Sequence, residues 1–222
     1  MWTVLACAGA FIALAVSAHL GLLNTFDSVI REWARPNDVW GTLQMRADYV
    51  VEGLRPAMIA SLLAAFTVAL CLIRRSLRPL LFVGVVGLTT VVLTVTAKMA
   101  VGRPDTHGTT GDSHGGSYPS GHIIAVVVCL GLVVLMTQPR ARRWVWLIPA
   151  LVGGLMGACL LVQAAHWSTD IVGGGLLAIG VLTAVTASGW DRWSLGPPGN
   201  HLSGNDSGSA SKQDARSAES GH

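Results

Sequence analysis

Residues 120–136, with the sequence SGHIIAVVVCLGLVVLM, form an apolar run that contains no Lys, Arg, Asp or Glu. The run is close to the ~17–25 residues that a helix needs to cross a bilayer. It does not alternate with period two, as a strand of a membrane barrel would. Five further runs of this kind lie at residues 3–23, 56–73, 80–97, 144–162 and 171–190. The sequence therefore predicts an all-α, polytopic membrane protein with six transmembrane helices.

The composition excludes several other classes of protein. Of the 222 residues, 51% are hydrophobic and 12% are charged, which is about half the charged share of a soluble domain. The net charge of +3 provides no electrostatic argument for binding nucleic acid. The four Cys lie singly in apolar runs, so neither a disulfide framework nor a thiolate zinc site is indicated. We expect residues 1–193 to form one membrane domain and residues 194–222, rich in Gly, Ser and charge, to form a disordered tail.

The loops predict how the chain sits in a plasma or inner membrane. Two short loops contain Arg and no acid, one with Arg74, Arg75 and Arg78 and the other with Arg140, Arg142 and Arg143. Because Arg-rich short loops face the cytoplasm, we expect both termini to be cytoplasmic. The connections after the third and fifth helices then face outward. They emerge on the same side because two spans separate them, so this side is the predicted position of an extracytoplasmic active site.

The segment Tyr118-Pro119-Ser120-Gly121-His122 leads directly into the run at 120–136. Ser is a good N-cap residue, and Gly lets the backbone approach a ligand. The first turn of a helix presents free N–H groups and a partial positive charge, so it favours a bound phosphate. His122 would then lie beside that anion. The alternative interpretation is a helix N-cap with an incidental histidine.

The other outer connection contains His166 and Asp170, which share a face if they lie on a helix. The carboxylate could accept a hydrogen bond from one imidazole nitrogen and leave the other free as a nucleophile. Lys98 and Arg103 stand at the end of the third run, where either could pair with a phosphate. The alternatives are an interfacial polar pair and cations that extend toward lipid headgroups. Four further residues of the outer loop fit no defined metal site by spacing, namely Asp105, His107, Asp112 and His114.

Together these residues resemble the three motifs of the type 2 phosphatidic acid phosphatase family of integral membrane lipid phosphatases. The second motif, Pro-Ser-Gly-His, is intact at residues 119–122, and the His and Asp of the third are His166 and Asp170. The resemblance covers about residues 98–175. It implies that His166 attacks phosphorus to form a phosphohistidine, that Asp170 stabilises the imidazolium, and that His122 acts as general acid and base. It also implies four substrate-binding residues and no metal or other cofactor; the four are Lys98, Arg103, Ser120 and Gly121.

The chain departs from the family motifs at two places. Counted from Lys98, Asp105-Thr106 stand where Arg-Pro is expected, although Arg103-Pro104 occur two residues earlier. Cys159-Leu160 replace the Ser-Arg of the third motif, so one phosphate-binding Arg is missing. Buried charge-assisted hydrogen bonds contribute roughly 1.5–3 kcal/mol each, so this loss predicts weaker binding or slower turnover unless another group compensates.

The resemblance implies a substrate whose lipid chain stays in the bilayer. Undecaprenyl diphosphate, phosphatidic acid and phosphatidylglycerol phosphate all fit, with a preference for a prenyl diphosphate because the predicted site faces outward. Two alternatives remain: a degenerate relative that binds lipid phosphates without hydrolysis, and a small membrane transporter or scaffold. Six apolar runs argue against a soluble vanadium haloperoxidase, which shares the motifs. The sequence predicts nothing about oligomeric state or the role of residues 24–55.

Overall fold

A computed structural model of the chain describes residues 2–108, 116–137 and 143–195. These residues form helices and no strand, as predicted. The predicted tail lies outside them, except that residues 194 and 195 end the last helix rather than beginning the tail. The α-helices are α1 (Trp2–His19), α2 (Asn24–Ala34), α3 (Thr42–Gly53), α4 (Pro56–Arg74), α5 (Arg78–Val101), α6 (Gly121–Thr137), α7 (Leu147–Val162), α8 (Ser168–Ser188) and α9 (Trp190–Leu195).

Each of the six predicted apolar runs corresponds to a helix. In the described residues, five apolar helical segments are long enough to cross a membrane: Trp2–His19, Thr42–Arg74, Arg78–Val101, Trp144–Val162 and Ser168–Ser188. The sixth, α6, is an apolar helix of 17 residues and is shorter than the others. Pro56 opens α4 and Pro79 follows the first residue of α5, where a missing backbone N–H costs no helical hydrogen bond.

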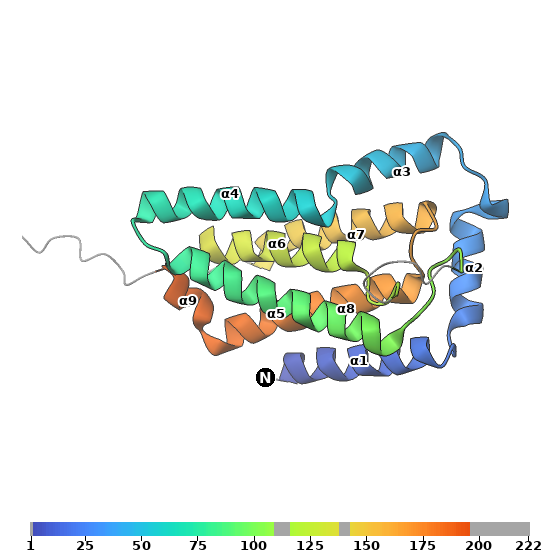
Figure 1. Cartoon of the computed structure of the whole chain (residues 1–222), viewed down its shortest axis with the longest axis horizontal. Coiled ribbons are helices and arrows are strands. Elements are labelled where there is room, and N and C mark those ends of the chain that lie inside the picture. Colours follow the sequence, from blue (N-terminus) through green and yellow to red (C-terminus); the bar gives the residue numbers. More distant parts are fainter. Residues whose placement is uncertain (1, 109–115, 138–142, 196–222) are drawn as a thin grey trace, which may run out of the picture.

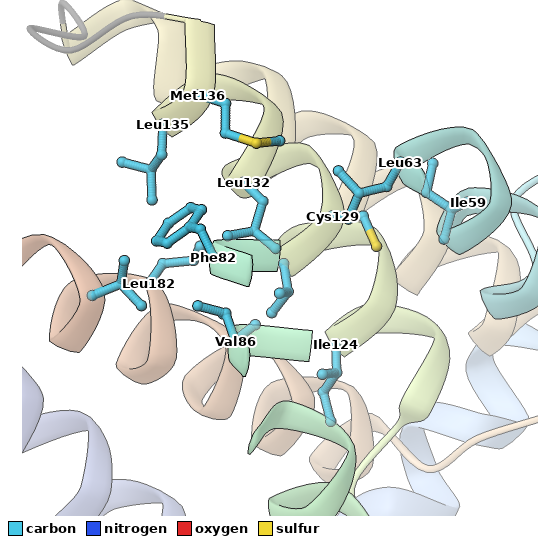
Figure 2. Packing of buried hydrophobic residues seen from close by; sticks show 13 residues of the cluster. Ile59, Leu63, Phe82, Val86, Ile124, Cys129, Leu132, Leu135, Met136 and Leu182 are labelled. Carbon is cyan, nitrogen blue, oxygen red and sulfur yellow. The ribbon is translucent and has the colours of Figure 1, made fainter. Parts of the chain in front are cut away.

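The central helix of the bundle is α6, which packs against α4, α7 and α8. Leu132 and Met136 of α6 are almost completely buried beside Phe82 of α5 and Leu182 of α8, as Figure 2 shows. Helix association in a membrane depends on close packing rather than on exclusion of water. Gly131 allows α6 and α8 to pack closely, because a Cβ at this position would lie only 2.5 Å from a methyl group of Leu182.

The first connection, whose role the sequence left open, folds into α2 and α3. Figure 1 shows α2 running across one end of the bundle, roughly perpendicular to the long helices. At that same end α5 finishes and α6 and α8 begin (Figure 1). The chain segments that carry the candidate site residues therefore meet beneath α2.

Candidate active site

The two histidines of the predicted site face each other at the end of the bundle beneath α2. His122 lies in the first turn of α6, and His166 lies two residues before α8 begins. Their ring centroids are 6.0 Å apart, and the ring planes are inclined by 70°. Two residues 44 positions apart in the sequence thus lie side by side in the structure.

The carboxylate of Asp170 lies opposite one nitrogen of His166. Its Oδ2 atom lies 3.5 Å from Nδ1 of His166, and its side chain is completely buried. This separation is longer than an ordinary hydrogen bond, as catalytic contacts often are before substrate binds. Among the described residues, Nδ1 of His166 has no hydrogen-bond partner. The arrangement leaves Nε2 as the nitrogen that does not face the carboxylate.

Ser120 connects the two histidine segments. Its backbone N–H donates to the carbonyl oxygen of Asp170 at 3.0 Å, which ties the start of α6 to the first turn of α8. The approach depends on Gly174, since a Cβ there would lie 2.8 Å from the Ser120 carbonyl oxygen. The Ser120 side chain is fully buried, and its Oγ has no partner among the described residues. Such an unpaired hydroxyl at a helix N-terminus suits an anion that accepts hydrogen bonds.

Arg103 is held by carboxylates. Its Nη1 donates to Oδ1 of Asp170 at 2.8 Å and to the hydroxyl of Thr169 at 2.6 Å. Its Nη2 donates to Oδ2 of Asp27 at 2.6 Å and, more weakly, to Asn24 at 3.3 Å. Only 4% of the Arg103 side chain is exposed. The sequence predicted a phosphate contact for Arg103, but in this structure both terminal nitrogens bind protein groups, because a second carboxylate that the motifs do not include lies beside it.

That second carboxylate, Asp27 of α2, was missed by the sequence analysis. It is 1% exposed and accepts hydrogen bonds from the Ser168 hydroxyl and from the backbone N–H of Thr169 at 3.0 Å. Asp27 thereby caps the N-terminus of α8 from another helix, since the N-cap residue Trp167 makes no side-chain cap of its own. Burial alone would raise the pKa of Asp27, but hydrogen bonds from Ser168, Thr169 and Arg103 hold that pKa below its ordinary value of 3.8. No sequence signal pairs Asp27 with Arg103, which is 76 residues away.

Lys98 and Asp105 stand on the loop side of the site. The Nζ atom of half-buried Lys98 donates to the carbonyl oxygen of Gly116 at 2.5 Å. Oδ1 of Asp105 accepts a hydrogen bond from the backbone N–H of His107 within the same loop. Asp112 and His114 lie outside the described residues. Within the described ranges, no three His, Cys, Asp or Glu side chains are grouped so that they could hold a metal ion.

Residues 78–194, slightly more than half of the chain, match the sequence profile of the PAP2 superfamily. The chain belongs to the PAP2 superfamily. The fold resembles the crystal structure of the first transmembrane PAP2 type phosphatidylglycerolphosphate phosphatase from Bacillus subtilis. The TM-score is 0.72 at 18% identity, covering 85% of this chain and 96% of that one. No curated protein sequence matches the chain significantly.

The matched region of this PAP2 protein contains every predicted site residue but excludes α2 and Asp27. It also contains Leu160, which stands where the third motif has an Arg. Leu160 is fully buried in an apolar cluster with Val126 and Met156, which is an environment unfavourable to a cation. Membership of the superfamily supports a membrane lipid phosphatase at the family level.

Proposed function

We propose that this PAP2 protein is a metal-independent phosphatase of membrane lipid phosphates that acts through a phosphohistidine. The observation that carries the proposal is the facing pair of His122 and His166 beside the N-terminus of α6, whose ring centroids lie 6.0 Å apart. The substrate class comprises lipid monophosphates and diphosphates, including undecaprenyl diphosphate, phosphatidic acid and phosphatidylglycerol phosphate. From the Arg-rich loops we place the site on the extracytoplasmic side, with both termini in the cytoplasm.

In the first step, Nε2 of His166 attacks phosphorus and the P–O bond to the leaving group breaks. His122, in its protonated form, donates a proton to the departing oxygen. Asp170 faces Nδ1 of His166 at 3.5 Å and stabilises the positive charge that the imidazole acquires. The products are the lipid alcohol, or a lipid monophosphate from a diphosphate, and the phosphohistidine.

In the second step, His122, now neutral, removes a proton from water as the water oxygen attacks phosphorus. The N–P bond to His166 breaks, and inorganic phosphate leaves. The free N–H groups at the start of α6, the Ser120 hydroxyl and Lys98 are the groups suited to stabilise charge on the phosphoryl oxygens. Arg103 contributes indirectly, because it fixes the carboxylate of Asp170.

A second candidate is a degenerate relative that binds lipid phosphate without hydrolysing it. The ion pairs of Arg103 with Asp27 and Asp170 favour this candidate, because they neutralise a positive charge that could otherwise bind the phosphate. Leu160 and Asp105 act in the same direction, since they occupy the positions where the family motifs have Arg.

The two candidates differ in a phosphatase assay on the full chain in detergent with a chelator present. We expect release of inorganic phosphate from at least one of the three lipid phosphates. His122→Ala should lower kcat by about 10²–10⁴-fold, the usual contribution of a general acid. His166→Ala should reduce the rate to background, because it removes the nucleophile.

His107→Ala is the matched control, because His107 is an exposed histidine of the neighbouring loop. Its rate should equal that of the wild type. A radiolabelled phosphoenzyme that is acid-labile and absent in His166→Ala would support the covalent step. Binding of lipid phosphate without any hydrolysis would favour the degenerate candidate, and equal rates in all variants would exclude the mechanism.

A further inference from the structure

An apolar groove of about 660 Å³ runs between α6, α7 and α8. The floor of the groove is α6, because α7 and α8 each contact α6 far more extensively than they contact each other. Ile123 and Ile171 line one end, and Trp146 and Thr186 line the other. No charged side chain of the described residues lines this groove. Its volume lies within the usual range for small-molecule pockets, roughly 300–1,000 Å³.

The groove begins directly beside the candidate active site. Ile123 follows His122 in α6, and Ile171 follows Asp170 in α8. The helices converge at this end because α7 has Gly157 there, whose Cβ would lie 3.0 Å from a methyl group of Ile171. Away from the site, the groove lies between Ala150 and Gly154 of α7 and Ile179 and Leu182 of α8.

The length of the groove suits a lipid chain. On α8 it extends from Ile171 to Thr186, which is about 22 Å at 1.5 Å per residue. Half of the hydrocarbon core of a bilayer is roughly 15 Å thick. An extended chain whose phosphate lies at the histidine pair would therefore follow the groove past the middle of the membrane.

Two glycines keep the walls of the groove open. A Cβ at Gly154 of α7 or at Gly175 of α8 would meet no atom within 4 Å. These positions differ from Gly131 and Gly153, where a Cβ would lie within 3 Å of a neighbouring side chain. Gly131 and Gly153 thus serve helix packing, whereas Gly154 and Gly175 leave space that no protein group fills.

We propose that this groove binds the long apolar chain of the lipid phosphate whose headgroup lies between His122 and His166. The inference rests on the proposed function and deepens it, because it assigns a binding site for the part of the substrate that does not react. The chain enters sideways from the bilayer and replaces a bilayer lipid along α7 and α8. Substrates with long chains should therefore be bound more tightly than short-chain analogues with the same headgroup.

Filling the groove tests this proposal. Gly154→Leu and Gly175→Leu place side chains in the open space and leave the histidine pair untouched. Gly84→Leu is the matched control, because Gly84 is an exposed helical glycine of α5 with open space around it and lies outside the groove. Each variant is assayed with dioleoyl phosphatidic acid in mixed micelles and with water-soluble dihexanoyl phosphatidic acid.

For both groove variants we expect kcat/KM to fall at least tenfold on the dioleoyl substrate and to change less than twofold on the dihexanoyl substrate. Gly84→Leu should match the wild type on both. An equal fall on both substrates, or no fall on either, would overturn the proposal.

A binding measurement keeps the test independent of activity. Phosphatidic acid with a photoreactive group near the end of one chain is cross-linked to the wild type, and the labelled peptides are identified by mass spectrometry. We expect label on α7 and α8, less label in Gly154→Leu, and little label from the matching phosphatidylcholine. If the wild type hydrolyses neither substrate but this pattern appears, the proposed function fails and the groove assignment stands. Equal labelling by both lipids, or none at the groove because a second copy of the chain covers it, would overturn the assignment.

Discussion

Asp27 and Arg103 form a 2.6 Å ion pair between α2 and the loop after α5, and both side chains are almost completely buried. Through the same guanidinium, Arg103 also binds Asp170, the carboxylate that faces His166. Helix α2, which lies outside the family motifs, is thereby linked to the candidate nucleophile through three charged side chains. From this link we expect Asp27 and Arg103 to act as positioning residues in the proposed reaction.

Arg103→Lys tests whether Arg103 positions Asp170 or binds substrate. Lysine keeps the charge but cannot bridge two carboxylates with a planar fork. We expect kcat to fall about 10- to 100-fold, equivalent to one lost charge-assisted hydrogen bond, with KM changing little. Steady-state kinetics on a lipid phosphate measure both parameters. A rise in KM at unchanged kcat would indicate instead that Arg103 contacts the phosphate.

Asp27→Asn tests the tertiary cap on α8. The amide keeps the shape but loses the charge that pairs with Arg103, so we expect the free energy of unfolding to fall by roughly 1–3 kcal/mol. The rate of the proposed phosphatase reaction should also fall, because Thr169 and Asp170 lose their fixed positions. Asp38→Asn is the control, since Asp38 forms a more exposed ion pair with Arg31, and such a pair contributes about 0–1 kcal/mol. Similar effects of the two substitutions would contradict a special role for Asp27.

The lowered pKa of Asp27 predicts that the stability difference between the wild type and Asp27→Asn depends on pH. The pKa of Asp27 is lowered in the folded protein from its ordinary value of 3.8. A lowered pKa means that the carboxylate stabilises the fold fully above pH 3.8 and loses that contribution as the pH falls through the folded-state pKa. The stability difference between wild type and Asp27→Asn should therefore be constant near neutral pH and shrink in acid. Thermal unfolding in detergent from pH 7 to about pH 3 measures this difference; a gap that widens in acid would contradict the assignment.

Gly174→Ala tests the junction between the two histidine segments. Its Cβ would lie 2.8 Å from the backbone carbonyl oxygen of Ser120, so the backbone must move. We expect a loss of about 1–3 kcal/mol in stability and a lower kcat/KM, because Ser120 leads into His122. Gly84→Ala in open space on α5 should instead stabilise its helix by roughly 0.5–1 kcal/mol. Unfolding curves that move in the same direction for both variants would show that the contact with Ser120 is unimportant.

Leu160→Arg tests whether the missing family cation can simply be restored. Leu160 is completely buried against Val126 and Met156, and an unpaired charge there is strongly unfavourable. We expect unfolding at lower temperature and no gain in phosphatase rate, whereas Leu160→Met should cost less than about 1.5 kcal/mol. A faster enzyme of undiminished stability would mean that position 160 reaches the phosphate.

Much of the architecture could be predicted from the chain because the bilayer restricts the possibilities. Runs without charge must become helices in hydrocarbon, and the helices at α4 and α7 end within one residue of the predicted runs. The meeting of His122 with His166 could be expected from counting spans, since an even number separates their loops. The fold of residues 24–55 could not be expected in this way, because the positions of α2 and α3 depend on the ends of the other helices against which they pack.

The protein partners of Arg103 show that a motif residue alone does not reveal all of its contacts. The sequence pairs an Arg with a phosphate by analogy, whereas its partners in the structure are set by geometry across 67 and 76 residues. A buried guanidinium binds the nearest carboxylates, because leaving either charge unpaired in a low-dielectric interior is costly. Asp27 is the nearer of the two carboxylates that bind Arg103, and no local sequence pattern predicts this pairing.

By itself, the sequence determined the helical membrane class and the order of the apolar segments, and it proposed a set of candidate site residues, because these follow from local hydropathy and residue type. Only the tertiary structure decided which of those side chains face one another, which cation is neutralised by carboxylates, and where an open groove leads away from the histidines. Those outcomes depend on how helices distant in sequence pack, and packing distances of a few ångströms are not encoded in any single segment.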